Sequence, residues 1–129
     1  MVKTSLVESD IAQGRQLIDA LKKIRSHFRV QAAFWLNSPE VMEWRLFIAT
    51  PLVDQRGPFS TYTDVQNVLR TNPKPWSISM QEISVVSPND KLVKIVKNAA
   101  AIPPDAPGIR FGRTRIDDTY IEDAYVYRV

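Results

Sequence analysis

The sequence predicts an α+β fold in which three helices pack on a mixed sheet of about five strands. Helical and extended patterns follow one another as helix, hairpin, helix, strand, helix, hairpin, so the sheet would be built from hairpin, strand and hairpin. The two strand–helix–strand connections between the hairpins predict parallel or nearly parallel strands there. The 129 residues form one predicted domain, residues 1–129, because domains usually contain about 100–150 residues.

The first predicted element is an amphipathic helix over residues 5–29. Ser5 and Glu8 have the spacing of a capping box, and Ser9-Asp10 is an alternative start. Basic residues near the end of the helix suit its dipole, which explains them without a ligand. The apolar stripe, at helical spacing, consists of Ile11, Ile18, Leu21, Ile24 and Phe28.

The first hairpin is predicted from residues 30–36 and 43–50. The segment Asn37-Ser38-Pro39-Glu40 has the composition of a turn. The second strand is almost continuously apolar after Arg45, which indicates a central strand covered on both faces. Pro51 ends that strand because it has no N–H to donate, and residues 52–57 are predicted as a loop.

Residues 58–70 predict a second helix that begins with Pro58, which suits a first helical turn. Residues 78–86 predict a strand, with a bulge at residues 81–82 where the alternation is disturbed. Ser87 has the position of a cap for a third helix over residues 91–100, followed by a stiff proline-rich loop. The expected apolar face of the second helix consists of Phe59, Tyr62, Val65 and Leu69.

The final hairpin, residues 108–129, is the clearest element. Two extended runs flank Asp117-Asp118, and with that pair as the turn Ile116 faces Thr119. Charged, apolar and cation–aromatic partners then agree in one register, as expected of a stable hairpin. Asp-Asp is a weaker turn signal than Asn-Gly, so a loop longer by one residue is the alternative. The further pairs are Arg113 with Glu122, Phe111 with Ala124, Ile109 with Val126, and Arg110 with Tyr125.

Composition excludes several kinds of chemistry. The chain has no cysteine, so disulfides, thiolate catalysis and cysteine-based zinc sites are excluded. The single histidine, His27, falls in a basic helix end and is predicted to be structural rather than catalytic. The four glycines do not form a phosphate-binding loop, and we expect no cofactor. No apolar run is long enough for a membrane span, and no signal peptide is evident, so we expect a cytoplasmic protein without membrane contact.

Three segments of the chain are similar to segments of known proteins: Glu43–Asp54, Ile83–Pro88 and Ile121–Arg128. The chain after residue 30 resembles small, stand-alone, uncharacterised bacterial α+β proteins. The resemblance implies a bacterial origin and no assigned activity, and it brings no catalytic motif.

The final hairpin also carries the best candidate for a binding surface. Arginine and tyrosine on a sheet can stack on bases and contact phosphates, and both are enriched at protein interfaces. Strict alternation puts Arg113, Arg115, Tyr120 and Arg128 on one face, and Arg110, Tyr125 and Tyr127 on the other. Alternating tyrosines are also ordinary strand formers. Trp35 and Trp44 flank the first hairpin's turn, where they would pair across strands or line a small-ligand pocket.

Acidic residues on or beside strands suggest a further alternative. A small metal-dependent nuclease holds Mg²⁺ with two or three carboxylates and a lysine. Glu43 shares its face of the strand with Arg45, and arginine is a poor replacement for that lysine. Nothing in the sequence forces the carboxylates together. They are Glu40, Glu43, Asp54, Glu82, Asp117, Asp118, Glu122 and Asp123.

These observations favour a non-catalytic interaction module that self-associates, because hairpins at the ends of a sheet leave edges that a second subunit can cover. We expect a homo-oligomer, with another protein as the further partner. The alternative is a nucleic-acid-binding protein that uses the final hairpin and the basic end of the first helix. The net charge of +3 permits such binding but does not require it.

Overall fold

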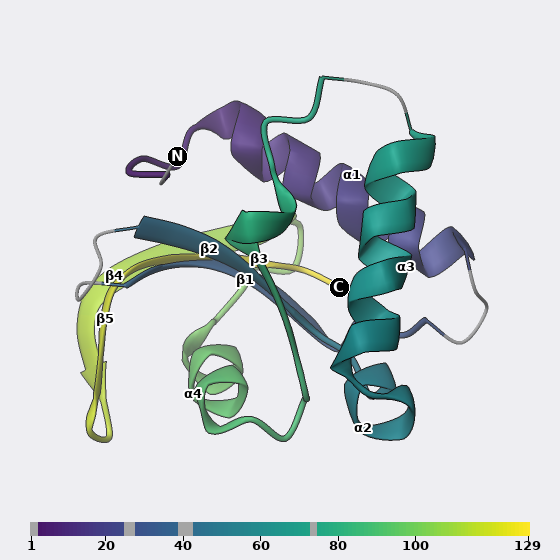
Figure 1. The fold of residues 1–129 in the computed structure, drawn as a ribbon. Coiled ribbons are helices and arrows are strands. Elements are labelled where there is room, and N and C mark those ends of the chain that lie inside the picture. The colour runs from purple at the N-terminus through teal and green to yellow at the C-terminus, as the bar shows by residue number, and fades with distance from the viewer. Residues whose placement is uncertain (1–2, 25–27, 39–42, 73–74) are drawn as a thin grey trace.

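The structure is a computed structural model that describes residues 3–24, 28–38, 43–72 and 75–129. These residues form one mixed sheet with helices on both faces (Figure 1), as the sequence predicts. The elements are α1 (Glu8–Ile24), β1 (Ala32–Ser38), β2 (Glu43–Ala49), α2 (Leu52–Arg56), α3 (Pro58–Thr71), a 3₁₀ turn (Met80–Glu82), β3 (Ile83–Val86), α4 (Lys91–Ala99), β4 (Gly108–Ile116) and β5 (Thr119–Tyr127).

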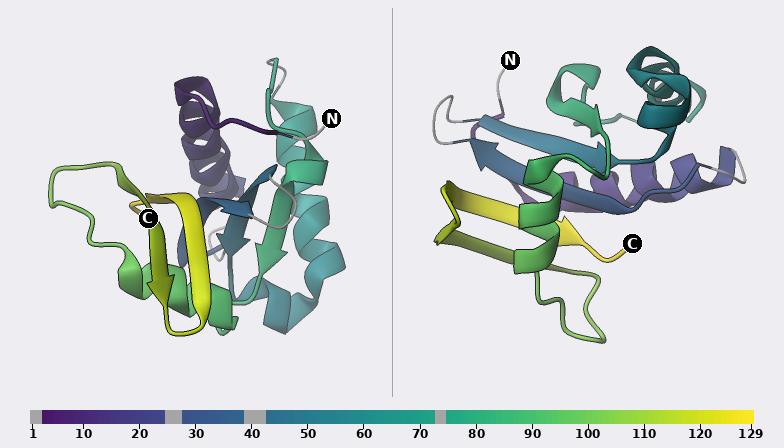
Figure 2. Two further views of the ribbon diagram at one scale, coloured as in Figure 1. Left: turned by 90° about the vertical axis from the view of Figure 1, so that its left-hand side faces the viewer. Right: turned by 90° about the horizontal axis from the view of Figure 1, so that it is seen from below.

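The strand order in the sheet is β3-β2-β1-β5-β4. β2 and β3 are parallel, as expected from the first crossover. The second crossover differs from the prediction: β4 lies at the opposite edge from β3 and runs in the opposite direction, because β5 pairs antiparallel with both β1 and β4. The final hairpin therefore joins the sheet beside β1, and α4 crosses beneath the sheet to reach it (Figure 2).

The two faces of the sheet bury two separate apolar clusters. α1 and α3 cover one face, where Leu17, Leu21, Val65 and Val68 belong to the same buried cluster as Trp35. α4 covers the other face, with Val93 and Val96 against Phe34 and Ile121. A sheet covered on both sides explains the continuous apolar run in β2, as predicted.

Several predicted element boundaries were wrong. α1 ends at Ile24 in the described residues, and Phe28 is buried in the core but lies outside the helix. Residues 52–57, expected as a loop, contain the short helix α2. The predicted strand over residues 78–86 begins only at Ile83, because a 3₁₀ turn with its own capping box precedes it. The turn predicted at residues 37–40 and His27 lie mostly or wholly outside the described residues.

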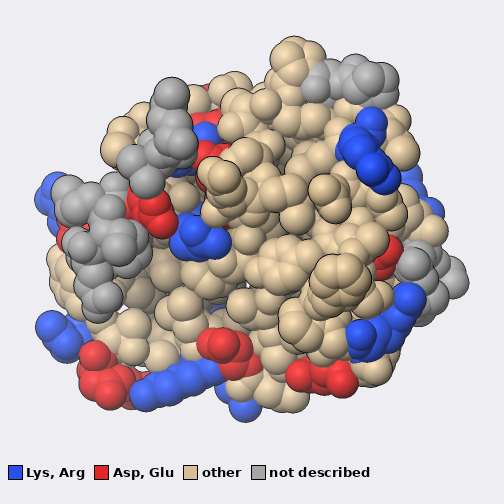
Figure 3. All heavy atoms as spheres, in the orientation of Figure 1, with Lys and Arg blue, Asp and Glu red and all other residues tan. Residues whose placement is uncertain are grey.

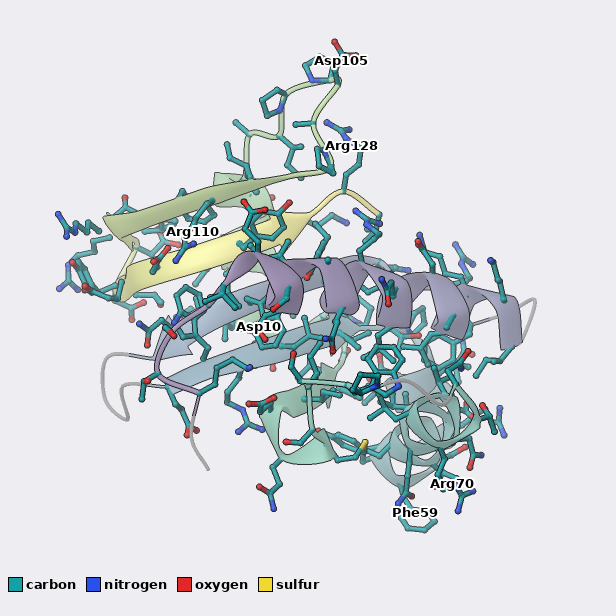
Figure 4. All side chains as sticks on the ribbon, turned by 90° about the horizontal axis from the view of Figure 1, so that it is seen from above. Asp10, Phe59, Arg70, Asp105, Arg110 and Arg128 are labelled. Atoms are coloured by element: carbon teal, nitrogen blue, oxygen red, sulfur yellow. The ribbon has the colours of Figure 1, made fainter. Side chains whose placement is uncertain are left out.

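The apolar face expected for the second helix is only partly correct. Thr61, Val65 and Val68 face the core, and Phe59 lies on the opposite side of α3 with 85% of its surface exposed. Figure 4 shows its ring pointing away from the molecule. Tyr62 lies at the boundary, where its hydroxyl accepts a hydrogen bond of 2.9 Å from the backbone N–H of Val85 on the edge strand β3.

The hydroxyl group of Tyr127 joins the last strand to the centre of the fold. It accepts a hydrogen bond of 2.9 Å from Trp35 Nε1 on β1 and donates one of 2.7 Å to the carbonyl of Ile11 on α1. Burial raises the pKa of Tyr127 well above its ordinary value, although the bond from Trp35 opposes the shift. The hydroxyl therefore keeps its proton and remains a donor.

This contact requires a glycine in α1. A Cβ atom at Gly14 would lie 2.1 Å from the Tyr127 hydroxyl and 3.2 Å from Trp35 Nε1. Both distances are shorter than ordinary contacts, so any side chain at position 14 would push the helix away from the sheet. The helix keeps a residue of low helical propensity because the packing leaves no room for another.

A polar cluster around the buried Asp10 connects the N-terminal segment to α1 and to the segment before β3. Lys3 Nζ lies 3.0 Å from Asp10 Oδ1 and 3.5 Å from Glu82 Oε2, and the Ser77 hydroxyl donates to the same Asp10 oxygen at 2.9 Å. Asp10 Oδ2 accepts from the N–H of Val7 at 3.1 Å, so Asp10, and not the predicted Ser5–Glu8 pair, caps the start of α1. Burial pushes the pKa of Asp10 upward, but these donors outweigh it, and the pKa lies below its ordinary value.

We predict that Gly14→Ala destabilises the protein. The higher helical propensity of alanine would by itself raise the free energy of unfolding by about 1 kcal/mol. The clash with Tyr127 should outweigh this gain, so that the variant is less stable than the parent by about 2 kcal/mol. Urea unfolding measures the change. Adding Tyr127→Phe to Gly14→Ala removes the nearest clashing atom, so the two effects should be less than additive. A Gly14→Ala variant as stable as the parent would contradict this packing.

We also predict that Asp10 contributes to stability at neutral pH but not in acid. Because the folded pKa is below 3.8, the contribution is present above that value and is lost as the pH falls through the folded pKa. Asp10→Asn should therefore cost about 1–2 kcal/mol at pH 7, and the difference from the parent should shrink in acid. Urea unfolding across pH tests this, with the exposed Asp105→Asn as a control that should show no such difference.

Candidate functional site

The β4–β5 hairpin has the register predicted from the sequence. Ile116 pairs with Thr119, Phe111 with Ala124, and Arg110 with Tyr125, so the turn is Asp117-Asp118. The pairing is interrupted at one position only within the described hairpin: Gly112 pairs with Asp123 and Thr114 with Ile121, but Arg113 and Glu122 are not paired. Arg113 has a backbone φ of 51°, in the left-handed region.

This interruption is a kink that inverts the alternation of side chains. In a regular strand Phe111 and Ile116 would lie on opposite faces. Both instead pack against the cluster beneath the sheet, together with Ile121 and Ala124. The tip of the hairpin thus curves over α4 (Figure 2), where Lys91 Nζ lies 3.3 Å from Asp118 Oδ1.

The kink corrects the predicted division of the hairpin into two faces. Arg110 and Arg115, expected on opposite faces, both lie on the side away from α4, because the alternation changes between them. Their cross-strand partners, Tyr125 and Tyr120, lie on that side as well. Arg113 projects from the kink itself and is exposed.

Three exposed side chains in the outer half of the hairpin, Arg113, Arg115 and Tyr120, form what we call the hairpin surface. Arg115 Cζ lies 5.8 Å from the centre of the Tyr120 ring, and Tyr120 is 40% exposed. Within the described residues neither arginine has an acidic partner, so the predicted Arg113–Glu122 ion pair does not form. These cationic groups are available to a partner.

Arg110 is engaged within the fold. Its Nε and one terminal nitrogen donate to the two carboxylate oxygens of Asp123 at 3.2 and 3.0 Å. Its Cζ lies 5.4 Å from the ring centre of Trp44 on β2, rather than over Tyr125. Figure 4 shows the side chain lying across the sheet. Arg110 therefore covers Trp44. Its side chain links residues of three strands: Arg110 itself on β4, Asp123 on β5 and Trp44 on β2.

Arg128 is also a structural residue in this arrangement. Its guanidinium donates to the backbone carbonyls of Ala106 at 2.8 Å, Ile102 at 3.2 Å and, in a shorter contact, Pro103. It thereby holds the proline-rich loop that leads into β4 (Figure 4). No local pattern indicates this role, because the carbonyl groups belong to a loop more than twenty residues away in the chain.

The two candidate tryptophans are core residues. Trp35 is 0% and Trp44 3% exposed, so neither ring can contact a ligand without a rearrangement. Trp35 bonds to Tyr127, and Lys3 Nζ lies 5.7 Å from its ring. Tyr127 is likewise buried, and Tyr125 is partly exposed with its ring in an edge contact to Tyr127.

The carboxylates are distributed over separate contacts. Glu43 lies 3.6 Å from Arg45, on the same face of β2 as predicted, and Arg45 also donates to Ser84. Asp54 accepts from Ser87 at 2.7 Å, and Glu82 lies beside Lys3. Among the residues that the structure describes, no three His, Asp or Glu side chains come together in a group that could hold a metal ion.

Charges of opposite sign alternate on the molecular surface. Figure 3 shows lysine and arginine atoms beside aspartate and glutamate atoms at the end of the molecule where Figure 1 places the hairpin. The hairpin itself contains four arginines and four acidic residues between residues 108 and 129. Its surface is mixed in charge and aromatic, rather than uniformly basic.

No protein-family model, curated protein or solved structure matches the chain. The resemblance to small bacterial proteins therefore stays a prediction. None of the helices in the described ranges is long and apolar enough to cross a membrane.

We predict that Arg113 tolerates only residues that accept a left-handed backbone. Asparagine adopts that conformation readily and valine does not, so Arg113→Asn should leave stability within about 0.5 kcal/mol, whereas Arg113→Val should cost about 1–2 kcal/mol. Arg115→Val is the matched control, because valine suits a regular strand. Equal stability of the two valine variants in urea unfolding would contradict the kink.

Proposed function

We propose that the protein is a non-catalytic, cytoplasmic interaction module that binds a protein partner, in the first instance a second copy of itself, through the hairpin surface. The observation that carries the proposal is that Arg113, Arg115 and Tyr120 are all exposed in the outer half of the final hairpin, with Arg115 against the Tyr120 ring and with no acidic partner for either arginine in the described part of the chain. Arginine and tyrosine supply much of the binding energy at protein interfaces.

The packing of the hairpin on α4 supports the hairpin surface as a binding site. The inner side of the hairpin packs on α4 through Phe111, Ile116 and Ile121, and Lys91 lies 3.3 Å from Asp118 at the exposed tip. The exposed side chains are thus presented on a fixed backbone, which lowers the entropic cost of binding.

The edges of the sheet indicate how a second copy would dock. Within the described chain no segment pairs with the outer edge of β4, whereas β3 at the other edge donates one N–H to Tyr62. Three arginines and a kink on β4 oppose extended strand-to-strand pairing. We therefore expect contact through side chains of the hairpin surface rather than one continuous sheet.

Nucleic-acid binding is the second candidate, and the Arg115–Tyr120 stack favours it because such pairs can stack on bases. The alternating charges in the hairpin argue against strong, salt-dependent attraction to phosphates. Because the mixed charge of the hairpin counts against phosphate binding, we rank nucleic-acid binding below binding of a protein partner.

The test is light scattering after size exclusion, at several protein concentrations and at low and high salt, with and without a mixed DNA/RNA ladder. We expect a mass that rises with concentration, and a shift toward monomer in the double variant Arg113→Ala, Arg115→Ala. The matched control is Lys94→Ala, Lys97→Ala, which removes the same charge from exposed positions on α4 and should keep the parental mass.

Two results would count against self-association through this surface. A monomer at all concentrations, or equal loss of mass in both double variants, would reject the proposed contact. A monomer that binds the ladder at low salt and releases it at high salt, dependent on Arg113 and Arg115, would establish the nucleic-acid alternative instead.

A further inference from the structure

A cleft of ≈ 400 Å³ lies between α1 and the C-terminal half of β5, at the opposite end of the hairpin from Tyr120. Ile11, Ala12 and Pro107 supply apolar walls, and Tyr125 supplies an aromatic one. Figure 4 shows α1 lying alongside β5 in the view from above. The volume is in the range of small-ligand and side-chain pockets, at its smaller end.

The cation that lines the cleft is already engaged. One terminal nitrogen of Arg15 donates to the carbonyls of Pro107 at 3.0 Å and Arg128 at 2.6 Å. Its other terminal nitrogen lies 3.8 Å from Asp19, and its Cζ lies 5.2 Å from the ring centre of Tyr127. Arg15 therefore closes one end of the cleft and joins α1 to the segment before β4.

Two polar groups of the lining remain without a partner in the described structure: the carboxylate of Glu8 and the hydroxyl of Tyr125. Glu8 is exposed, at the start of α1, where its charge also suits the helix dipole. Tyr125 is partly buried, with its ring lying over Gly108, where a Cβ atom would be 2.6 Å from the hydroxyl. Both groups can accept hydrogen bonds, and one is an anion.

We propose that this cleft binds an organic cation, a guanidinium or primary ammonium group carried on a short apolar stem. The stem would pack against Ile11, Ala12 and Pro107, and the cationic head would donate to Glu8 and Tyr125. Arginine and lysine side chains have this construction, as do small free amines. The proposal does not depend on the hairpin surface, because the residues that carry it lie on α1, at Pro107 and at the other end of β5.

The test is NMR titration of the full chain with three probes: agmatine, blocked arginine (N-acetyl-arginine methylamide) and the matching blocked citrulline, which has the same shape without the charge. We expect saturable shifts of the amide signals of Ala12 and Tyr125 with both cations. Citrulline should bind about fivefold more weakly or worse, because it lacks the charge-assisted bond. Agmatine carries a second positive charge, so tighter binding of agmatine would show that its ammonium group adds to binding, whereas equal or tighter binding of blocked arginine would indicate a side chain of a partner protein.

Variants separate the two parts of the cleft. Glu8→Gln should weaken the binding of both cationic probes by about two- to fivefold, as expected for an exposed ion pair. The affinity for blocked citrulline should not change. Ala12→Leu should fill the cleft and reduce binding of every probe, and leucine suits this exposed helical position. Asp117→Asn at the hairpin tip is the charge-matched control, since asparagine tolerates the φ of 56° there.

The proposal is overturned by equal affinity for blocked arginine and blocked citrulline, by shifts that map away from α1 and β5, or by no saturable shift with any probe. It is also overturned if Asp117→Asn weakens binding as much as Glu8→Gln does, since that result would indicate only a general attraction to negative charge.

Discussion

The buried hydroxyl of Tyr127 connects three parts of the chain that are far apart in sequence. It accepts from Trp35 on the central strand and donates to the carbonyl of Ile11 on the first helix, and without it the buried N–H of the Trp35 ring would lose its partner. Buried polar groups cost stability when they lose their partners. The contact joins α1 to β1 and β5, requires a glycine at position 14, and lies beside the cleft between α1 and β5.

A second constraint lies in the backbone at Arg113. A left-handed residue in the middle of a strand is uncommon and carries a small conformational cost. Here it turns the end of the hairpin over α4 and keeps Ile116 and Ile121 in the core. The same turn brings Arg115 and Tyr120 to the side on which Arg110 lies. The kink thus decides both how the hairpin is buried and which of its side chains a partner can reach.

The arginines of this protein illustrate that residue type alone does not define a binding surface. Arg15 and Arg128 donate to backbone carbonyls, and Arg110 pairs with Asp123 above Trp44. Only Arg113 and Arg115 of the hairpin extend to solvent without such bonds among the described residues. The other three arginines are engaged in contacts within the fold. These contacts join the segments around the hairpin surface and the α1–β5 cleft.

Elements whose causes are local could be predicted from the amino-acid sequence. The register of the final hairpin follows from adjacent cross-strand pairs, α3 begins at Pro58 as predicted, and alternating helical and extended patterns specify the α+β class. The strand order, the kink at Arg113, the exposure of Phe59 and the partners of Arg110 and Arg128 became evident only in the folded molecule. Each of these depends on contacts between distant segments, which compete with local preference and which neither spacing nor composition records.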